Sequence, residues 1–251
     1  MSLALLSDMI APGSPLATGL GPSLAPPSSK FRMGTDQLGR DWFSGIVHGS
    51  RIALLVSVVA AVTATTIGLI MGVVSGYFGG LTDDLLMRAT EIMMVLPTFI
   101  LALVVVTLYG NSIWNMVFVI GVLSWPTIAR IARAEVLSFR EREFVEAARM
   151  LGSNSIDVMF KEILPNILPP VIVAGSLQMS TSIIIEAGLS FLGLGDPTVL
   201  SWGRMLYIAQ QAFQAGAWWL VVFPGTMITV AALAFNLVGD GLNDALNPRL
   251  R

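Results

Sequence analysis

Four long stretches of the chain contain no Asp, Glu, Lys, Arg or His, and they constrain its fold more than any other feature. They lie between Arg51 and Asp83, Glu91 and Arg130, Glu162 and Glu186, and Arg204 and Asp240. A charged side chain at the centre of a bilayer costs at least about 2.5 kcal/mol, and a helix that crosses the bilayer needs about 20 apolar residues. The pattern therefore predicts an all-α, polytopic membrane protein.

Composition excludes several other classes of protein. Of the 251 residues, 55% are hydrophobic and only 12% are charged, whereas soluble domains carry roughly 25% charged residues. A single core in a chain of this length could not bury so much apolar surface. The net charge of −2 gives no support for a nucleic-acid partner. Because His48 is the single histidine and cysteine is absent, disulfides, thiol nucleophiles and multi-histidine metal sites are excluded.

Five membrane-spanning helices fit within residues 51–251. The first stretch holds one helix, at about 52–76. The second stretch is too long for one crossing, and the turn-forming residues 109–112 divide it into a helical hairpin. The third holds a helix at about 168–192. The fourth begins with three glutamines and becomes apolar at Trp218 and Trp219, a pair typical of a membrane interface.

Lysine and arginine predict the orientation of these helices. The loop that precedes the third stretch is rich in basic residues, and the C-terminal tail ends with Arg249 and Arg251. The positive-inside rule places both segments in the cytoplasm. Residues 31–50 then form an extracytoplasmic segment before the first helix, although Arg32 and Arg40 in that segment depart from the rule.

The N-terminal segment is harder to interpret. Residues 1–10 are apolar but too short to span a bilayer, and they lack the basic region of a signal peptide. Residues 11–29 are rich in Pro, Gly and Ser, which is typical of a flexible or extended linker. We expect residues 1–30 to be a truncated or flexible N-terminal segment.

The cytoplasmic loop at about 138–165, here called the coupling loop, contains a short amphipathic helix. Its small and apolar residues recur at helical spacing: Phe144, Ala147, Ala148 and Leu151. Arg142 and Glu146 are four residues apart, so we expect them to pair. Gly152 can end the helix with a positive φ, and Asn154 or Ser155 can cap the next one. The simplest interpretation is a hairpin that only links two membrane helices.

The spacing in this loop resembles the EAA loop of ABC importer permeases. Six residues match that pattern in register: Glu146, Ala147, Ala148, Gly152, Leu164 and Pro165. Glu162 stands where the family has isoleucine, and Ile163 comes one position later. The resemblance implies a coupling helix that docks in a groove of a cytoplasmic ATPase.

Other motifs are similar to the C-type permeases of dipeptide, oligopeptide and nickel importers. They are GTDQLGRD at residues 34–41, SFLGLG at 190–195, SWG at 201–203 and NLVGDGLNDALNPR at 236–249. The resemblance implies a type I ABC importer permease fold in the prokaryotic cytoplasmic (inner) membrane. The family usually has six crossings, so the helix before residue 34 is missing or truncated here.

The same resemblance implies partners and a non-catalytic role. The partners are a B-type permease subunit, two cytoplasmic ATP-binding subunits that hold ATP and Mg, an extracytoplasmic substrate-binding protein and membrane lipid. This chain has no GxxxxGK[ST] motif and no nucleophile–base pair, so we expect no cofactor in it and no enzymatic activity of its own. Whether the partner permease is distinct or identical stays open.

The substrate and two charged residues leave alternatives open. Di- or oligopeptides are the favoured substrates, with nickel or oligosaccharides as alternatives; an autonomous channel or secondary transporter is a different class. Glu186 either lines the pathway or pins a helix contact. Glu91 is either interfacial or paired with Arg88, and His48 is a surface or interfacial residue rather than a metal ligand.

Overall fold

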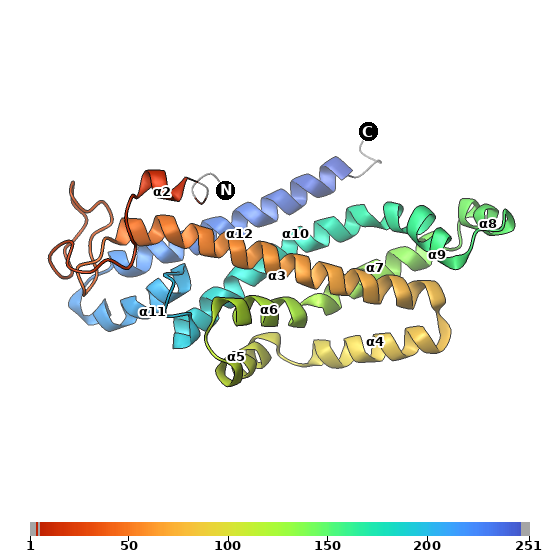
Figure 1. The fold of residues 1–251 in the computed structure, drawn as a ribbon, viewed down its shortest axis with the longest axis horizontal. Helices are drawn as coiled ribbons and strands as arrows, with labels where there is room; N and C mark the ends of the chain where they lie inside the picture. The colour runs from red at the N-terminus through yellow and green to blue at the C-terminus, as the bar shows by residue number, and fades with distance from the viewer. Residues whose placement is uncertain (1–3, 5, 247–251) are drawn as a thin grey trace.

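The computed structural model describes residue 4 and residues 6–246, which form an elongated bundle of helices (Figure 1). No β-strand occurs in this part of the chain. The principal helices are α2 (Ser7–Ile10), α3 (Trp42–Phe78), α4 (Gly80–Val95), α5 (Thr98–Tyr109), α6 (Ile113–Leu123), α7 (Trp125–Phe139), α8 (Glu143–Met150), α9 (Ser155–Asp157), α10 (Leu164–Leu189), α11 (Trp202–Ala212) and α12 (Trp219–Leu246). Two π-helical segments, η1 (Val158–Ile163) and η2 (Ser190–Leu194), continue α9 and α10, and a 3₁₀ turn, η3 (Phe213–Ala215), follows α11.

The expectation of five crossings is confirmed, with one of them broken. Four helical segments of the described chain are long and apolar enough to cross a membrane: Trp42–Phe78, Ile113–Phe139, Ser155–Leu194 and Trp219–Leu246. The fifth is the pair α4 and α5, which meet at an angle of 84°. Pro97 explains this bend, because a proline disfavours the helical conformation at the preceding residue, and Leu96 has a ψ of 128°.

Several of the expected helices have different boundaries. The first begins at Trp42 rather than near residue 52, so part of the segment expected before it, residues 31–50, is helical. The third crossing does not begin near residue 168 but extends back without a break to Ser155. The fourth charge-free stretch contains two helices, because Gly216, with a φ of +75°, separates α11 and η3 from α12. Of the tryptophan pair, Trp218 is 56% exposed, whereas Trp219 is buried against the rest of the chain.

Helix α3 lies in the centre of the bundle and approaches α7 through glycines. A Cβ atom added at Gly72 would lie 2.4 Å from the Ala129 carbonyl oxygen, and one at Gly68 would lie 2.7 Å from Ile128 Cβ. Small residues at four-residue spacing allow this approach, which is the usual basis of helix packing in membranes.

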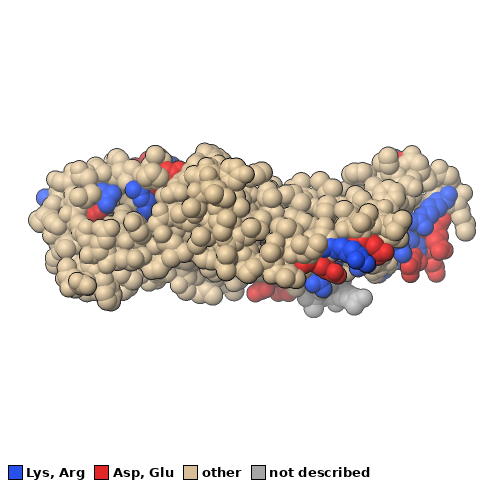
Figure 2. Space-filling model, turned by 90° about the horizontal axis from the view of Figure 1, so that it is seen from below, with Lys and Arg blue, Asp and Glu red and all other residues tan. Residues whose placement is uncertain are grey.

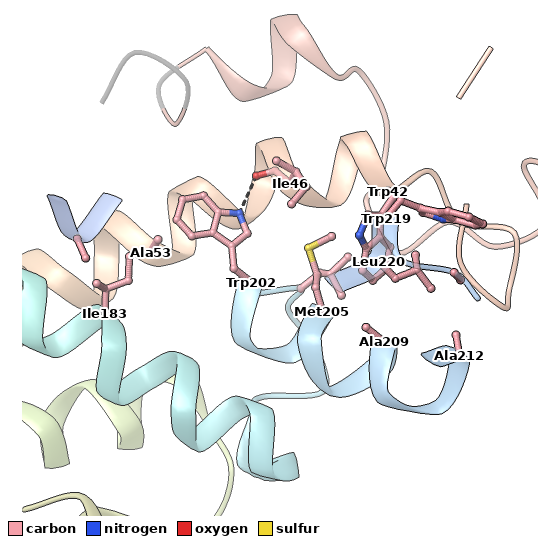
Figure 3. Close-up of a cluster of buried hydrophobic side chains, with 13 residues drawn as sticks. Trp42, Ile46, Ala53, Ile183, Trp202, Met205, Ala209, Ala212, Trp219 and Leu220 are labelled. Carbon is pink, nitrogen blue, oxygen red and sulfur yellow. Dashed lines mark hydrogen bonds between the residues drawn. The ribbon is translucent and has the colours of Figure 1, made fainter. Parts of the chain in front are cut away.

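Residues 11–41 are extended and packed against the end of the bundle where α3, α11 and α12 meet (Figure 1). The Gly19 N–H donates to the Leu38 carbonyl at 2.8 Å, and the Trp219 Nε1–H donates to the Thr35 carbonyl at 3.2 Å. Trp202 Nε1–H donates to the Ile46 carbonyl at 2.9 Å within the same buried cluster (Figure 3). The Trp219 bond holds the extended segment to α12, and the Trp202 bond holds α11 to α3.

The loop around Asp36 is closed by a buried ion pair. Asp36 Oδ2 lies 2.6 Å from Arg40 Nε, and both side chains are almost completely buried. Asp36 Oδ1 also accepts hydrogen bonds from the N–H groups of Leu38 and Arg40, each at 2.9 Å. Asp36 and Arg40 of the GTDQLGRD motif therefore neutralise each other's charge inside the chain.

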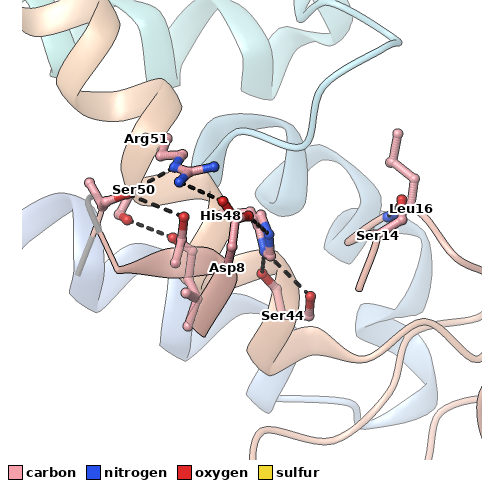
Figure 4. Close-up of polar contacts among 10 residues, drawn as sticks. Asp8, Ser14, Leu16, Ser44, His48, Ser50 and Arg51 are labelled. Atoms are coloured by element: carbon pink, nitrogen blue, oxygen red, sulfur yellow. Dashed lines mark hydrogen bonds and ion pairs between the residues drawn. The ribbon is translucent and has the colours of Figure 1, made fainter. Parts of the chain in front are cut away.

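His48 belongs to a surface cluster that attaches α2 to α3 (Figure 4). Its Nε2 lies 3.4 Å from Asp8 Oδ1, and Arg51 Nη2 lies 2.8 Å from Asp8 Oδ2. The hydrogen bond from Arg51 is the main cause that lowers the pKa of Asp8. The position agrees with a surface histidine.

A side chain from a distant loop caps the start of α6. The Ile113 N–H donates to Asp196 Oδ2 at 2.9 Å, although 83 residues separate them. Burial opposes the ionisation of Asp196, but hydrogen bonds from Thr198 and Ile113 hold its pKa below the usual range. The loop after η2 is therefore tied to the α5–α6 turn.

On the face shown in Figure 2, charged side chains lie at one end of the molecule and along the opposite half, with a band almost free of charge between the two groups. The larger group lies at the end that carries α8 in Figure 1. This distribution is the one that a charge-free bilayer interior requires.

Candidate functional site

The coupling loop projects from one end of the bundle (Figure 1). Helix α8 has Glu143 and Glu146 in its first turn and Arg149 in its last, charges that complement the helix dipole. Val145 is completely buried among residues of α3, α7 and the Ser155–Leu194 helix. One buried side chain thus anchors a helix whose other residues are mostly accessible.

Gly152 ends α8 as the sequence predicts. Its φ is +91°, a conformation that favours glycine. The Gly152 N–H donates to the Arg149 carbonyl at 3.0 Å, and the Ser153 N–H donates to the Ala148 carbonyl at 3.1 Å. This pair of bonds is a Schellman motif. The Asn154 side chain then accepts from the Asp157 N–H and caps the next helix, also as predicted.

The two alanines of the EAA pattern face different ways. Ala147 is exposed, whereas Ala148 is half-buried and packs against the cluster that holds Val145. Large hydrophobic side chains of the loop are also accessible, beside the charged Glu143 and Glu146 of α8: Phe144, Met150, Leu151, Ile156 and Phe160. The expected apolar face is therefore divided between the chain's own core and an open surface.

Glu146 is exposed and is not paired with Arg142, which corrects the expected ion pair. Arg142 precedes α8 as its N-cap, so it is not on the helix face that carries Glu146. Its guanidinium lies 4.5 Å from the centre of the Phe139 ring instead. A cation–π contact of this kind takes the place of the pair.

The second half of the motif lies in the first turns of the long helix. Leu164 is partly buried in the same cluster, and Pro165 is exposed near the start of α10. Ile163 is completely buried, whereas Glu162 is partly exposed. The π-helical turns of η1 change the phase of the helix, and they place Ile163 rather than residue 162 in the core.

Glu186 lies outside this site, at the contact between α10 and α11. Its side chain is 3% exposed, and its Oε1 accepts from the Ser190 hydroxyl at 2.6 Å. The Ser201 side chain reaches the same carboxyl group. A Cβ atom at Gly203 would lie 2.6 Å from the Ala187 backbone, so the two helices are in close contact beside it.

A charged cavity of about 750 Å³ between α4 and α7 was not predicted from the sequence. Asp83 and Arg133 form a bidentate ion pair across it, with both N–O distances at 2.5 Å. Glu91 lines the same cavity and makes no ion pair with Arg88 in the described chain. The sequence shows acidic and basic residues at the ends of the charge-free stretches, but it does not show which of these ends lie next to each other in the fold.

Residues 64–251 match the protein family described as the binding-protein-dependent transport system inner membrane component. The chain belongs to this family. It is therefore a membrane permease of an ABC importer, and the alternative of an autonomous channel or secondary transporter is wrong. Residues of the EAA pattern and the three later motifs all fall inside the matched range.

Individual relatives extend the likeness of the permease toward its N-terminus. The di/tripeptide transport system permease protein DppC of Pseudomonas aeruginosa is 38% identical over 255 residues, which cover 99% of this chain and 84% of that protein. The dipeptide transport system permease protein DppC of Alkalihalophilus pseudofirmus is 38% identical over 250 residues, which cover 99% and 82%.

A solved structure confirms the fold of the permease. A chain of the MetNI methionine ABC transporter, in an inward-facing conformation, superposes with a TM-score of 0.64 at 19% identity. The match covers 82% of this chain and 98% of that chain. The expected type I ABC importer permease fold is therefore confirmed.

Proposed function

We propose that this permease moves di- or oligopeptides into the cell and forms half of the translocation pathway. The names of the two DppC relatives support a peptide substrate. In this proposal a B-type permease forms the other half, and an extracytoplasmic binding protein delivers the substrate. Two cytoplasmic ATP-binding subunits hold ATP and Mg and supply all of the catalysis.

The observation that carries the coupling role is the open apolar surface on α8. An eight-residue helix that is anchored through Val145 and closed by Gly152 is a rigid projection. Its exposed apolar side chains require a protein partner at the polar end of the bundle. Movement of two ATP-binding subunits toward each other would displace this projection and switch the permease between inward-facing and outward-facing states.

The six residues of the motif have different roles in this proposal. Glu146 and Ala147 contact the ATP-binding subunit directly, because they are exposed on α8. Ala148 and Leu164 hold α8 against the chain's own core, Gly152 caps it, and the exposed Pro165 begins the long helix. Glu186 pins the α10–α11 contact rather than lining the pathway.

The orientation is part of the same proposal. The coupling loop and the C-terminus face the cytoplasm, and residues 31–50 face the outside of the inner membrane. The concentration of charge at the end that carries α8 supports this arrangement (Figure 2).

Crosslinking tests the docking surface. The chain lacks cysteine, so Ala147→Cys and Ala148→Cys each introduce a single thiol that a photoactivatable maleimide can modify in the assembled complex. We expect crosslinks to the ATP-binding subunit from Ala147→Cys and far fewer from the matched variant Ala148→Cys. Equal yields, or crosslinks only to lipid, would contradict the assignment of the two faces.

Uptake tests the substrate. The complete transporter in proteoliposomes, with its binding protein and internal ATP, should accumulate a labelled di- or oligopeptide. Excess unlabelled peptide should compete, whereas nickel and oligosaccharides should not. Uptake of nickel or an oligosaccharide instead of peptides would replace the proposed substrate, and uptake without ATP would refute the proposed mechanism.

A further inference from the structure

Two helix breaks meet at a neutral cavity that opens to the surface of the bundle, because Met94, Thr127 and Thr181 in its wall are exposed. The cavity has a volume of about 200 Å³ and includes residues on both sides of the α4–α5 bend, among them Met94 and Thr98. On its other side it is lined by Ser124, the residue that separates α6 from α7. Irregular backbone at membrane depth is tolerated only where protein covers it or water fills the space beside it.

The polar groups around this cavity are uncharged. Thr98, Ser124, Thr127, Gln178 and Thr181 all line it, and none of the described residues in its wall is ionisable. An adjoining cavity of about 400 Å³ shares Thr127, Gln178 and Thr181. Hydroxyl and amide side chains from three helices, α5, α7 and α10, thus line one space.

Ser124 is buried there without a hydrogen-bond partner. Its side chain is 8% exposed, and its Oγ contacts no donor or acceptor within the described residues. A buried hydroxyl without a partner costs on the order of 1–3 kcal/mol. By contrast, Thr226 and Thr229 on α12 donate to carbonyl groups of their own helix. Because Ser124 lines the cavity, rotation of its side chain would present this hydroxyl to a molecule that enters.

The start of α5 adds a positive end to the same space. Pro97 precedes this twelve-residue helix, and no side chain caps its first N–H groups. The N-terminus of a helix carries about half a positive charge and binds carboxylates through these N–H groups. Arg130 lies at the rim, with Nη1 3.6 Å from Met94 Sδ, where the neutral cavity adjoins the charged one.

We propose that this cavity binds the terminal carboxylate of a peptide during translocation. The proposal rests on the proposed function, because it requires that the permease carries peptides. The carboxylate accepts hydrogen bonds from the start of α5 and from the Ser124 hydroxyl, and the remaining hydroxyl and amide groups bond the peptide backbone. Among the described residues, no acidic side chain lines the cavity itself.

The test measures access to the cavity and its protection by ligand. Thr127→Cys introduces the sole thiol of this chain, and a charged methanethiosulfonate labels it in the purified complex without the binding protein. We expect labelling at Thr127→Cys and none at the matched control Thr229→Cys, which replaces an exposed α12 threonine. Absence of labelling at Thr127→Cys would overturn the proposal, because the site would then not be aqueous.

Protection identifies the ligand. The dipeptide that the uptake assay shows to be transported should slow the labelling of Thr127→Cys about tenfold at ten times its dissociation constant. Its C-terminal amide should protect much less. Adding Ser124→Ala should raise the concentration needed for half-protection by the free acid about ten- to a hundredfold. Equal protection by acid and amide, or none by either, would overturn the carboxylate site while peptide uptake by the wild type still supported the transport function.

Discussion

Replacing Gly152 with alanine isolates the contribution of the α8 cap. Gly152 has a φ of +91°, and a Cβ atom built on it meets no other atom within 4 Å. The alanine methyl group therefore causes no collision, and the penalty is confined to the backbone. An L-residue in the left-handed region costs about 1–2 kcal/mol.

This penalty is large for so short a helix. An isolated helix of eight residues is far below the length that is stable in water, so α8 depends on its cap and on the burial of Val145. A loss of 1–2 kcal/mol lowers the ratio of capped to uncapped loop by a factor of about 5–30. Gly152→Asn should cost less, because asparagine tolerates this backbone conformation better than alanine does.

The assay compares peptide uptake with ATP hydrolysis in proteoliposomes that contain the complete transporter. We expect Gly152→Ala to lower the number of peptides transported per ATP, while the permease remains in the membrane. Gly216→Ala is the matched control, because Gly216 has a φ of +75° and equal space around its Cβ position but lies at the other end of the bundle. The reasoning is refuted if Gly152→Ala leaves the ratio unchanged or if Gly216→Ala lowers it equally.

Three further substitutions test contacts at the end of the bundle away from α8. Asp36→Asn leaves the buried Arg40 guanidinium without its anion, so it should destabilise the permease by about 3–5 kcal/mol, measured as a lower thermal unfolding midpoint in detergent. The pKa of Asp196 is lower in the folded chain than its unfolded value of 3.8, so its ionised form stabilises the fold above pH 3.8 and this stabilisation is lost as the pH falls through the folded pKa. Asp196→Asn should therefore remove the part of the fall in the unfolding midpoint at acidic pH that this carboxylate causes. Trp219→Phe replaces the buried indole with a smaller phenyl ring and loses its hydrogen bond to Thr35, so it should cost at least about 1 kcal/mol by the same measurement, with a further loss from the cavity that remains.

The number of crossings could be predicted because the membrane penalises charge so strongly. A charge-free stretch has few alternatives to a buried or lipid-facing helix. Turns and helix caps could also be predicted from residue type. Three of them occur where expected: the turn at residues 109–112, the positive φ of Gly152 and the cap at Asn154. In each of these cases the residue itself carries the preference.

Features that depend on distant contacts could not be read in this way. Pro97 is visible in the sequence, but the 84° turn it allows depends on how α4 and α5 pack. The apolar face of α8 was recognised, yet periodicity does not distinguish a side chain such as Ala148, which faces the chain's own core, from Ala147, which faces outward. The sequence could not decide whether Glu186 lines the pathway or pins a helix contact, because the helix that packs beside it, α11, follows a separate loop.

The two proposed sites are joined by one continuous helix. Val145 and Ala148 of α8 pack against the first turns of the Ser155–Leu194 helix, and the same helix carries Gln178 and Thr181 into the neutral cavity. At 1.5 Å per residue, about 30 Å of helix separates these regions. A displacement of α8 by an ATP-binding subunit would therefore reach the cavity along this helix, which can bend at its π-helical turns and at its internal proline pair. Because the walls of the cavity come from α4, α5, α6, α7 and α10, movement of α10 alone would separate the hydrogen-bonding groups proposed to hold a carboxylate. Such a movement would link ATP-driven motion to release of the peptide.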